Sequence, residues 1–263
     1  MSKRFALGPV VIIAALGATF VGLDIIDVVE IYELPLSVPI LNTVFIAAVA
    51  VIVVYVVARK AAVSALPQPA LWLACGVLSL GAGILLYGWL PADELNVRIS
   101  IHESTTLIAA TLHLTGVILE VSRPRPPGSG FRQKPRIILL YYLAVIALIA
   151  VVTLLAFRDV IPPFSYPDKS SLLRSGVEIT ALVFFLVSSF IYLRMYSRSQ
   201  TAFHFWYSLG LLLLAEGSIF LFLGSLRGLI AWIGRAAQYT GGIYLLAAVL
   251  SSDQPPAGEK ISR

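Results

Sequence analysis

Charged side chains are scarce in this sequence of 263 residues. Asp, Glu, Lys and Arg make up 13% of it, against roughly 25% in soluble domains. Hydrophobic residues make up 59%, which is more apolar surface than a soluble core of this length can bury. The composition therefore excludes an ordinary soluble domain, and it leaves no length for a separate soluble catalytic domain.

Cysteine and the common catalytic motifs are rare or missing. Cys75 is the only cysteine, which excludes an intramolecular disulfide and a thiolate metal cluster. The apolar segments contain no lysine for a retinal Schiff base, and no G-x-S-x-G, H-E-x-x-H or glycine-rich phosphate motif occurs. The net charge of +5 does not indicate a nucleic-acid partner, because the basic residues lie in short loops.

Long apolar segments fill the rest of the chain. Each is close to the roughly 20 residues that a helix needs to cross the hydrocarbon core of a bilayer. We therefore predict an all-α integral membrane protein, a bundle of eight transmembrane helices in one domain over residues 1–250, embedded in the lipid bilayer. Residues 251–263 are polar and are predicted to be a disordered cytoplasmic tail. The predicted spans are residues 5–25, 37–58, 70–90, 100–121, 137–157, 172–194, 203–225 and 229–250.

The basic residues predict the orientation of these spans. Positively charged loops stay on the cytoplasmic side of a membrane, and an even number of spans with the N-terminus inside places most Lys and Arg there. Both termini are then cytoplasmic. The residues assigned to that side are Lys3, Arg4, Arg59, Lys60, Arg123, Arg125, Arg132, Lys134, Arg136, Arg194, Arg198, Lys260 and Arg263; those left outside are Arg98, Arg158, Lys169, Arg174 and Arg227.

Ionisable residues inside the last two spans point to a site. Glu216 and Arg235 lie on consecutive antiparallel spans, roughly 13 Å and 9 Å below the outer surface at 1.5 Å per residue. They can therefore meet, with Gln238 and Tyr239 as hydrogen-bond partners. Two interpretations stay open, because a buried ion pair serves either structure or ligand binding.

Further polar groups fall in the same outer half. Glu178 lies about 9 Å deep in the sixth span by the same rise, and His102 and Glu103 begin the fourth. Ionisable groups inside spans tend to face the bundle interior. We therefore predict a polar ligand-binding pocket that opens to the outside and contains Glu178, Glu216, Arg235, Gln238, Tyr239, His102 and Glu103.

Histidines and carboxylates suggest two cofactors. His102 with Asp24 and Asp27, which lie three residues apart on one helix face, supplies ligands that suit a divalent metal, although the spacing matches no known metal motif. A haem needs facing histidines on two helices. His113 and His204 are the remaining ones, and their predicted depths match poorly.

Glycines in the eighth span predict close helix packing. Gly234 and Gly241 are seven residues apart and lie on one helix face, where a second helix can approach closely. The partner is either another helix of the same chain or a second copy in a homodimer.

The last third of the chain carries a family resemblance. The motifs GVEI, R-x-x-S-R, WYSLGLLLLAEG and WIGRAAQYTGGIYLLAAV, between Gly176 and Leu250, resemble the C-terminal helices of MASE3-like multi-spanning membrane-associated sensor modules. The resemblance implies a sensory function in a prokaryotic cytoplasmic membrane. Such modules precede signalling domains, whereas the predicted tail here is short, so we expect a stand-alone protein or a separate cytoplasmic signalling partner.

Three functions stay open at this point. The first is a membrane-embedded sensory or ligand-binding module whose outer pocket biases helix packing. The second is an integral membrane subunit of an electron-transfer or transport complex that holds haem, quinone or pigment. The third is a metal-dependent membrane enzyme that uses metal-bound water near His102.

Overall fold

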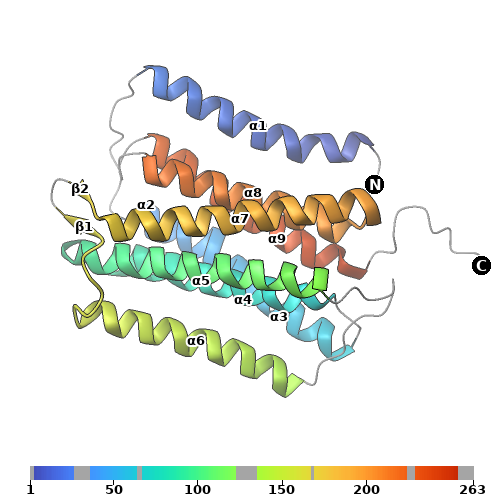
Figure 1. Ribbon diagram of the computed structural model, residues 1–263, viewed down its shortest axis with the longest axis horizontal. Coiled ribbons are helices and arrows are strands. Elements are labelled where there is room, and N and C mark those ends of the chain that lie inside the picture. Colours follow the sequence, from blue (N-terminus) through green and yellow to red (C-terminus); the bar gives the residue numbers. More distant parts are fainter. Residues whose placement is uncertain are drawn as a thin grey trace, which may run out of the picture. The chain divides into compact units, whose positions relative to one another are not determined.

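The structure is a computed structural model that describes residues 3–26, 36–63, 67–122, 135–166, 169–223 and 229–253. These residues are almost entirely helical (Figure 1). The long helices are α1 (Lys3–Ile26), α3 (Ala48–Val63), α4 (Gln68–Trp89), α5 (Leu95–Ser122), α6 (Pro135–Phe157), α7 (Leu172–Ser199), α8 (Ala202–Leu223) and α9 (Leu229–Leu250). The short elements are α2 (Ser37–Asn42), the π-helical turn η1 (Thr43–Ala47), η2 (Ala92–Glu94), β1 (Ser165–Tyr166), β2 (Lys169–Ser170) and η3 (Ser251–Asp253).

Each predicted span coincides with a helix, and α2, η1 and α3 run on from one another to form the second. Among the described residues, six helices are long and apolar enough to cross a membrane. Helices α1 and α9 are not among them, so their crossing stays a prediction. In α9 the polar Arg235 and Gln238 lower the hydropathy, and the apolar stretch of α1 covers only Gly8–Thr19.

Two local details differ from the prediction. Helix α5 begins at Leu95 rather than near residue 100, because the chain turns at Pro91 and η2 and nothing after them interrupts a helix. Residues in the predicted break near Pro162 to Pro167 include a short antiparallel pair, in which Ser165 faces Ser170.

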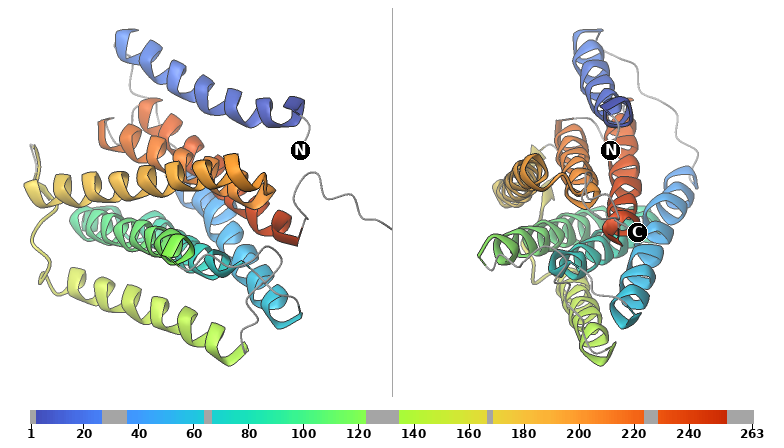
Figure 2. Two further views of the ribbon diagram at one scale, coloured as in Figure 1. Left: turned by 45° about the vertical axis from the view of Figure 1, so that its right-hand side comes forward. Right: turned by 90° about the vertical axis from the view of Figure 1, so that its right-hand side faces the viewer.

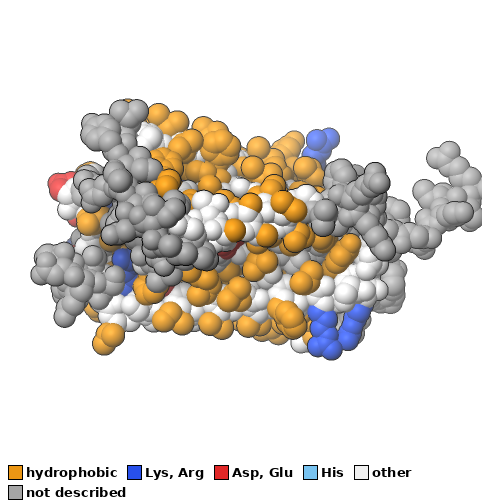
Figure 3. All heavy atoms as spheres, turned by 90° about the horizontal axis from the view of Figure 1, so that it is seen from above, with side chains coloured by type: hydrophobic (Ala, Val, Ile, Leu, Met, Phe, Trp, Pro, Cys, Tyr) orange, Lys and Arg blue, Asp and Glu red, His pale blue; other side chains and the backbone are white. Residues whose placement is uncertain are grey.

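The surface of α6 indicates contact with lipid. Its buried positions, Ile138, Tyr142, Val145 and Ile149, recur every three or four residues and so mark one face. The opposite face is also apolar, since Leu139, Leu140 and Leu154 are each more than half exposed. Hydrophobic side chains likewise extend along the visible face in Figure 3. A helix that is apolar all round suits a membrane interior, so the chain is a multi-pass helical membrane protein.

The chain divides into two compact units. Unit 1 comprises Met1–Glu33 with Phe185–Arg263, and unit 2 comprises Leu34–Phe184. Helix α7 therefore contributes its first half to unit 2 and its second half to unit 1. The expected single domain over residues 1–250 stays a prediction, and most of the expected tail, residues 254–263, lies outside the described residues.

The core of unit 2 is the antiparallel pair of α4 and α5, which lie side by side in Figures 1 and 2. Glycines of each helix face bulky side chains of the other: a methyl group on Gly76 would lie 2.5 Å from the imidazole of His113, and one on Gly116 would lie 2.8 Å from Trp72. The hydroxyl of Ser79 also donates a hydrogen bond to the carbonyl of Thr105 at 3.0 Å. Small residues thus let the two helices approach closely.

The core of unit 1 is the pair of α8 and α9, which meet along glycines. A Cβ atom added to Gly217 would lie 2.7 Å from the carbonyl oxygen of Gly234, and one added to Gly241 would lie 3.1 Å from that of Gly210. The spacing of seven residues on both helices keeps these contacts on one face. The glycine face predicted for the eighth span is therefore packed against α8 within the same chain.

We expect Gly217→Ala to destabilise the protein by about 1–3 kcal/mol, because the new methyl group meets backbone, which cannot move aside as a side chain can. The free energy of unfolding in mixed micelles measures this. The matched control is Gly176→Ala in α7, where nothing lies within 4 Å of the added carbon and stability should stay the same or rise slightly. Equal effects of the two substitutions would contradict the close α8–α9 contact.

Candidate functional site

Local hydrogen bonds fix the start of α7 beside α5 in unit 2. Ser171 lies just before the helix, and its hydroxyl accepts a hydrogen bond from the backbone N–H of Arg174 at 3.1 Å, as an N-cap residue does. The backbone N–H of Ser171 donates to the carbonyl of Phe164, whose own N–H donates to the side-chain oxygen of Asn96 in α5. The first turns of α5 and α7 are thereby held together.

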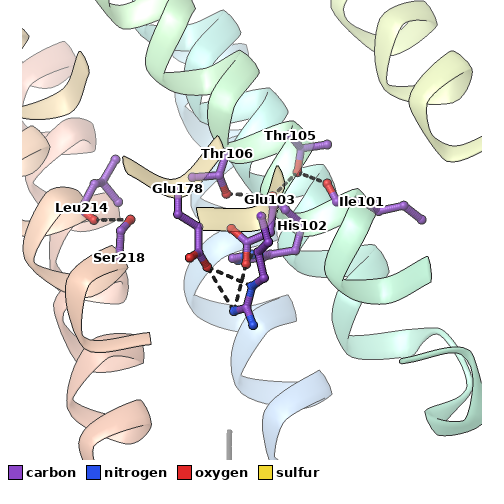
Figure 4. A network of polar contacts seen from close by, with 9 residues as sticks. Ile101, His102, Glu103, Thr105, Thr106, Glu178, Leu214 and Ser218 are labelled. Carbon is purple, nitrogen blue, oxygen red and sulfur yellow. Dashed lines mark hydrogen bonds and ion pairs between the residues drawn. The ribbon is translucent and has the colours of Figure 1, made fainter. Parts of the chain in front are cut away.

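Arg174 joins two carboxylates at this place. Its Nη2 lies 3.0 Å from Oε1 of Glu178, one helical turn further along α7, and its Nε donates to the same oxygen at 3.1 Å. The same Nη2 donates to Oε1 of Glu103 in α5 at 3.3 Å. Figure 4 shows the two carboxylates converging on one guanidinium. We call Glu103, Arg174 and Glu178 the charge cluster.

The charge cluster is buried. The side chains of Glu103, Arg174 and Glu178 are 9%, 11% and 10% exposed, respectively. Buried charges are expensive unless they are paired and hydrogen-bonded. Glu178 is only partly paired, because its second oxygen, Oε2, is enclosed and has no hydrogen-bond partner among the described residues.

His102 forms the more open side of this site. Its Nδ1 lies 3.7 Å from Oε1 of Glu103, and its side chain is 14% exposed. The ring packs against Tyr87 of α4 with centroids 5.5 Å apart. The guanidinium of Arg98 lies over the Tyr87 ring at 4.7 Å and donates to the Tyr87 carbonyl. The cluster thus contacts α4 through a histidine and a tyrosine.

The structure therefore brings together three of the predicted site residues, Glu178, His102 and Glu103. They form a cluster with Arg174, which the sequence interpretation assigned only to an outer loop. The sequence did contain a pattern that could have predicted this role of Arg174. Arg174 and Glu178 are four residues apart, which places opposite charges on one helix face.

The other predicted site residues lie in unit 1. The guanidinium of Arg235 lies over the ring of Trp232 at 4.8 Å, and Gln238 is buried against Gly217. One oxygen of Glu216 is buried without a hydrogen-bond partner among the described residues, and the other faces Gly17 of α1. The predicted meeting of Glu178 with Glu216, Arg235 and Tyr239 stays a prediction, because Glu178 belongs to the other unit.

The predicted metal and haem sites gain no support. The side chain of Asp24 and all of Asp27 lie outside the described residues. Within the described part of the chain, no group of three His, Cys, Asp or Glu residues is arranged to hold a metal ion. The histidines considered for haem lie in different units. His113 is fully buried against Gly76 in unit 2, and Nδ1 of His204 in unit 1 is hydrogen-bonded to Ser199 and Thr201.

Comparisons with protein-family models, with curated proteins and with solved structures found no match to this chain. The fold and the site define it as a multi-pass helical membrane protein with a buried charge cluster between α5 and α7.

We expect Arg174→Gln to destabilise the protein by about 3–5 kcal/mol, because it leaves the buried carboxyl groups of Glu103 and Glu178 without the cation that they share. The free energy of unfolding in mixed micelles measures the change. Arg194→Gln is the matched control, since Arg194 is an exposed arginine of the same helix and its loss should cost less than about 1 kcal/mol. If both variants are as stable as the wild type, the charge cluster does not hold α5 and α7 together.

Proposed function

We propose that this chain is a membrane-embedded sensory or ligand-binding module, with the charge cluster as its site. The observation that carries the proposal is the burial of Glu103, Arg174 and Glu178 between two membrane-spanning helices. A well-packed apolar contact would stabilise the helices as well as this ion cluster does or better. Ionisable groups inside spans are rare, and by default they mark a functional site.

Helix α7 supplies a route for the signal. Its first half, with Arg174 and Glu178, belongs to unit 2, and its second half belongs to unit 1. In unit 1, Ser189 of α7 donates a hydrogen bond to the carbonyl of Ser208 in α8. Because both halves belong to one helix, we expect a change in the packing of its first turns to reach its second half. Signalling requires that the ligand bind two packings of these helices with different affinity.

The same proposal includes the finer assignments made from the sequence. The chain is a MASE3-like sensor module in a prokaryotic cytoplasmic membrane, crosses it eight times with both termini inside, and acts through a cytoplasmic signalling partner. The motifs between Gly176 and Leu250 and the distribution of Lys and Arg support these assignments. Glu216 and Arg235 are proposed as a second polar site, in unit 1.

Cys75 tests the sensory function, because this single cysteine of α4 is buried in the helix pair that carries Glu103. Changing the charge balance of the site with Glu103→Gln should shift the packing of α4 on α5. We expect the rate at which a membrane-permeant maleimide labels Cys75 to change, by roughly tenfold for a shift of about 1.4 kcal/mol.

The matched control is Glu94→Gln, which neutralises an exposed carboxylate just before α5 and should leave the labelling rate at the wild-type value. Identical labelling of wild type and Glu103→Gln would mean that the charge state of the site has no effect on this packing, and the sensory proposal would fail.

The orientation has its own test in a Cys75→Ser background. Arg59 and Asp93 are exposed and are assigned to opposite sides of the membrane. We expect a membrane-impermeant maleimide to label Asp93→Cys in intact cells, and to label Arg59→Cys only after permeabilisation. The reverse pattern would invert the proposed topology, and labelling of both in intact cells would contradict an odd number of crossings between them.

A further inference from the structure

The described charges at the buried cluster do not balance. Two carboxylates, Glu103 and Glu178, contact one guanidinium, so the three groups carry a net charge of minus one when both acids are ionised. A buried charge without compensation is strongly unfavourable. Among the described residues, the cluster therefore lacks one positive charge as long as His102 is neutral.

Within the described residues of unit 2, helices α5 and α7 contribute the charged groups nearest the cluster. Helix α7 contributes Arg174 and Glu178 themselves. Helix α5 contributes Glu103 and also His102, whose Nδ1 is 3.7 Å from Glu103, beyond hydrogen-bond distance. Arg98, also of α5, is directed at Tyr87 of α4, where it contacts both the ring and the carbonyl. Neither neighbour contacts the Oε2 atom of Glu178, which has no partner among the described residues.

The enclosure of Oε2 of Glu178 limits which ion or group can supply the missing positive charge. Oε2 of Glu178 has essentially no accessible surface, so a metal ion or an ammonium ligand cannot reach it without a rearrangement of the helices. A divalent ion also lacks a set of three ligands among the described residues. A proton needs no additional space, and it converts the oxygen into a hydroxyl that donates a hydrogen bond.

We propose that the charge cluster is a proton-binding site, in which Glu178 carries a proton while Glu103 stays ionised beside Arg174. The proton comes from a hydronium ion of the surrounding solution, which becomes a water molecule, and it forms an O–H bond on Glu178 that makes the cluster neutral. Two carboxylates that share a site commonly hold one proton between them. This inference deepens the proposed function, since it names the proton as the ligand of the same site.

Infrared spectroscopy of the full chain in lipid nanodiscs at neutral pH tests this site directly. A protonated carboxyl gives a carbonyl stretch that is distinct from that of a carboxylate and shifts in D₂O. We expect wild type to show such a band, Glu178→Gln to lose it, and Glu94→Gln to keep it. Glu216→Gln serves as a second control, because it removes a buried carboxyl of unit 1 and should leave the Glu178 band in place.

The Glu103→Gln variant tests whether the proton on Glu178 depends on the neighbouring carboxylate or on burial alone. Without Glu103, Glu178 and Arg174 balance each other, so the proton should leave Glu178 and the band should disappear, although Glu178 itself is still present. A band that persists in Glu103→Gln would overturn the shared-proton site. Absence of any band sensitive to Glu178→Gln in folded wild-type protein would also overturn it, and would place the charge on His102 or on a bound cation.

The infrared experiment tests the proton-binding site, and the labelling experiment tests the sensory function, so either proposal can fail without the other. If the band behaves as expected while Cys75 labelling is the same in all variants, the proton-binding site stands and the sensory function is wrong. If labelling responds but no protonated carboxyl is found, the module is sensory and its ligand is not a proton.

Discussion

The site depends on one interaction, the contact of the Arg174 guanidinium with the carboxyl groups of two glutamates. Glu103 on α5 and Glu178 on α7 are both held by one guanidinium, and all three side chains are about nine-tenths buried. The Ser171 cap and the Phe164–Asn96 hydrogen bond keep the starts of the two helices in place. Burying ionised groups inside a membrane protein costs free energy, so ligand binding explains this arrangement better than a gain in stability does. A proton would neutralise the excess negative charge of the cluster.

Most of the fold could be predicted from the sequence because membrane helices obey one strong rule. The backbone of a span must satisfy its hydrogen bonds internally, so a long apolar segment is a helix wherever it occurs, and all eight predicted segments are helical. Whether α1 and α9 cross the membrane was less predictable, because α9 contains Arg235 and Gln238 and the apolar stretch of α1 is short. The π-helical turn η1 and the short strand pair had no signal of their own.

The site could be predicted only in part. Depth along a helix follows from the rise per residue, and this placed His102, Glu103 and Glu178 in the same outer half of the bundle. It could not show which helices are neighbours, since contacts between helices depend on packing. The prediction grouped Glu178 with Glu216 and Arg235, which stays a prediction. It did not include Arg174, although the spacing of Arg174 from Glu178 is typical of an ion pair within one helix. The glycine pattern of α9 predicted close packing, but only the structure identified α8 as the partner.

The central claim is that Arg174 is present to balance buried carboxylates, and a double variant tests it most directly. Arg174→Gln with Glu103→Gln keeps similar side-chain volumes and removes one charge of each sign, since Glu103 is the carboxylate that stays ionised beside Arg174. The account predicts that this double variant unfolds with a higher free energy than Arg174→Gln alone, because fewer uncompensated charges are left at the site. A double variant that is as unstable as the sum of the two single variants would contradict it.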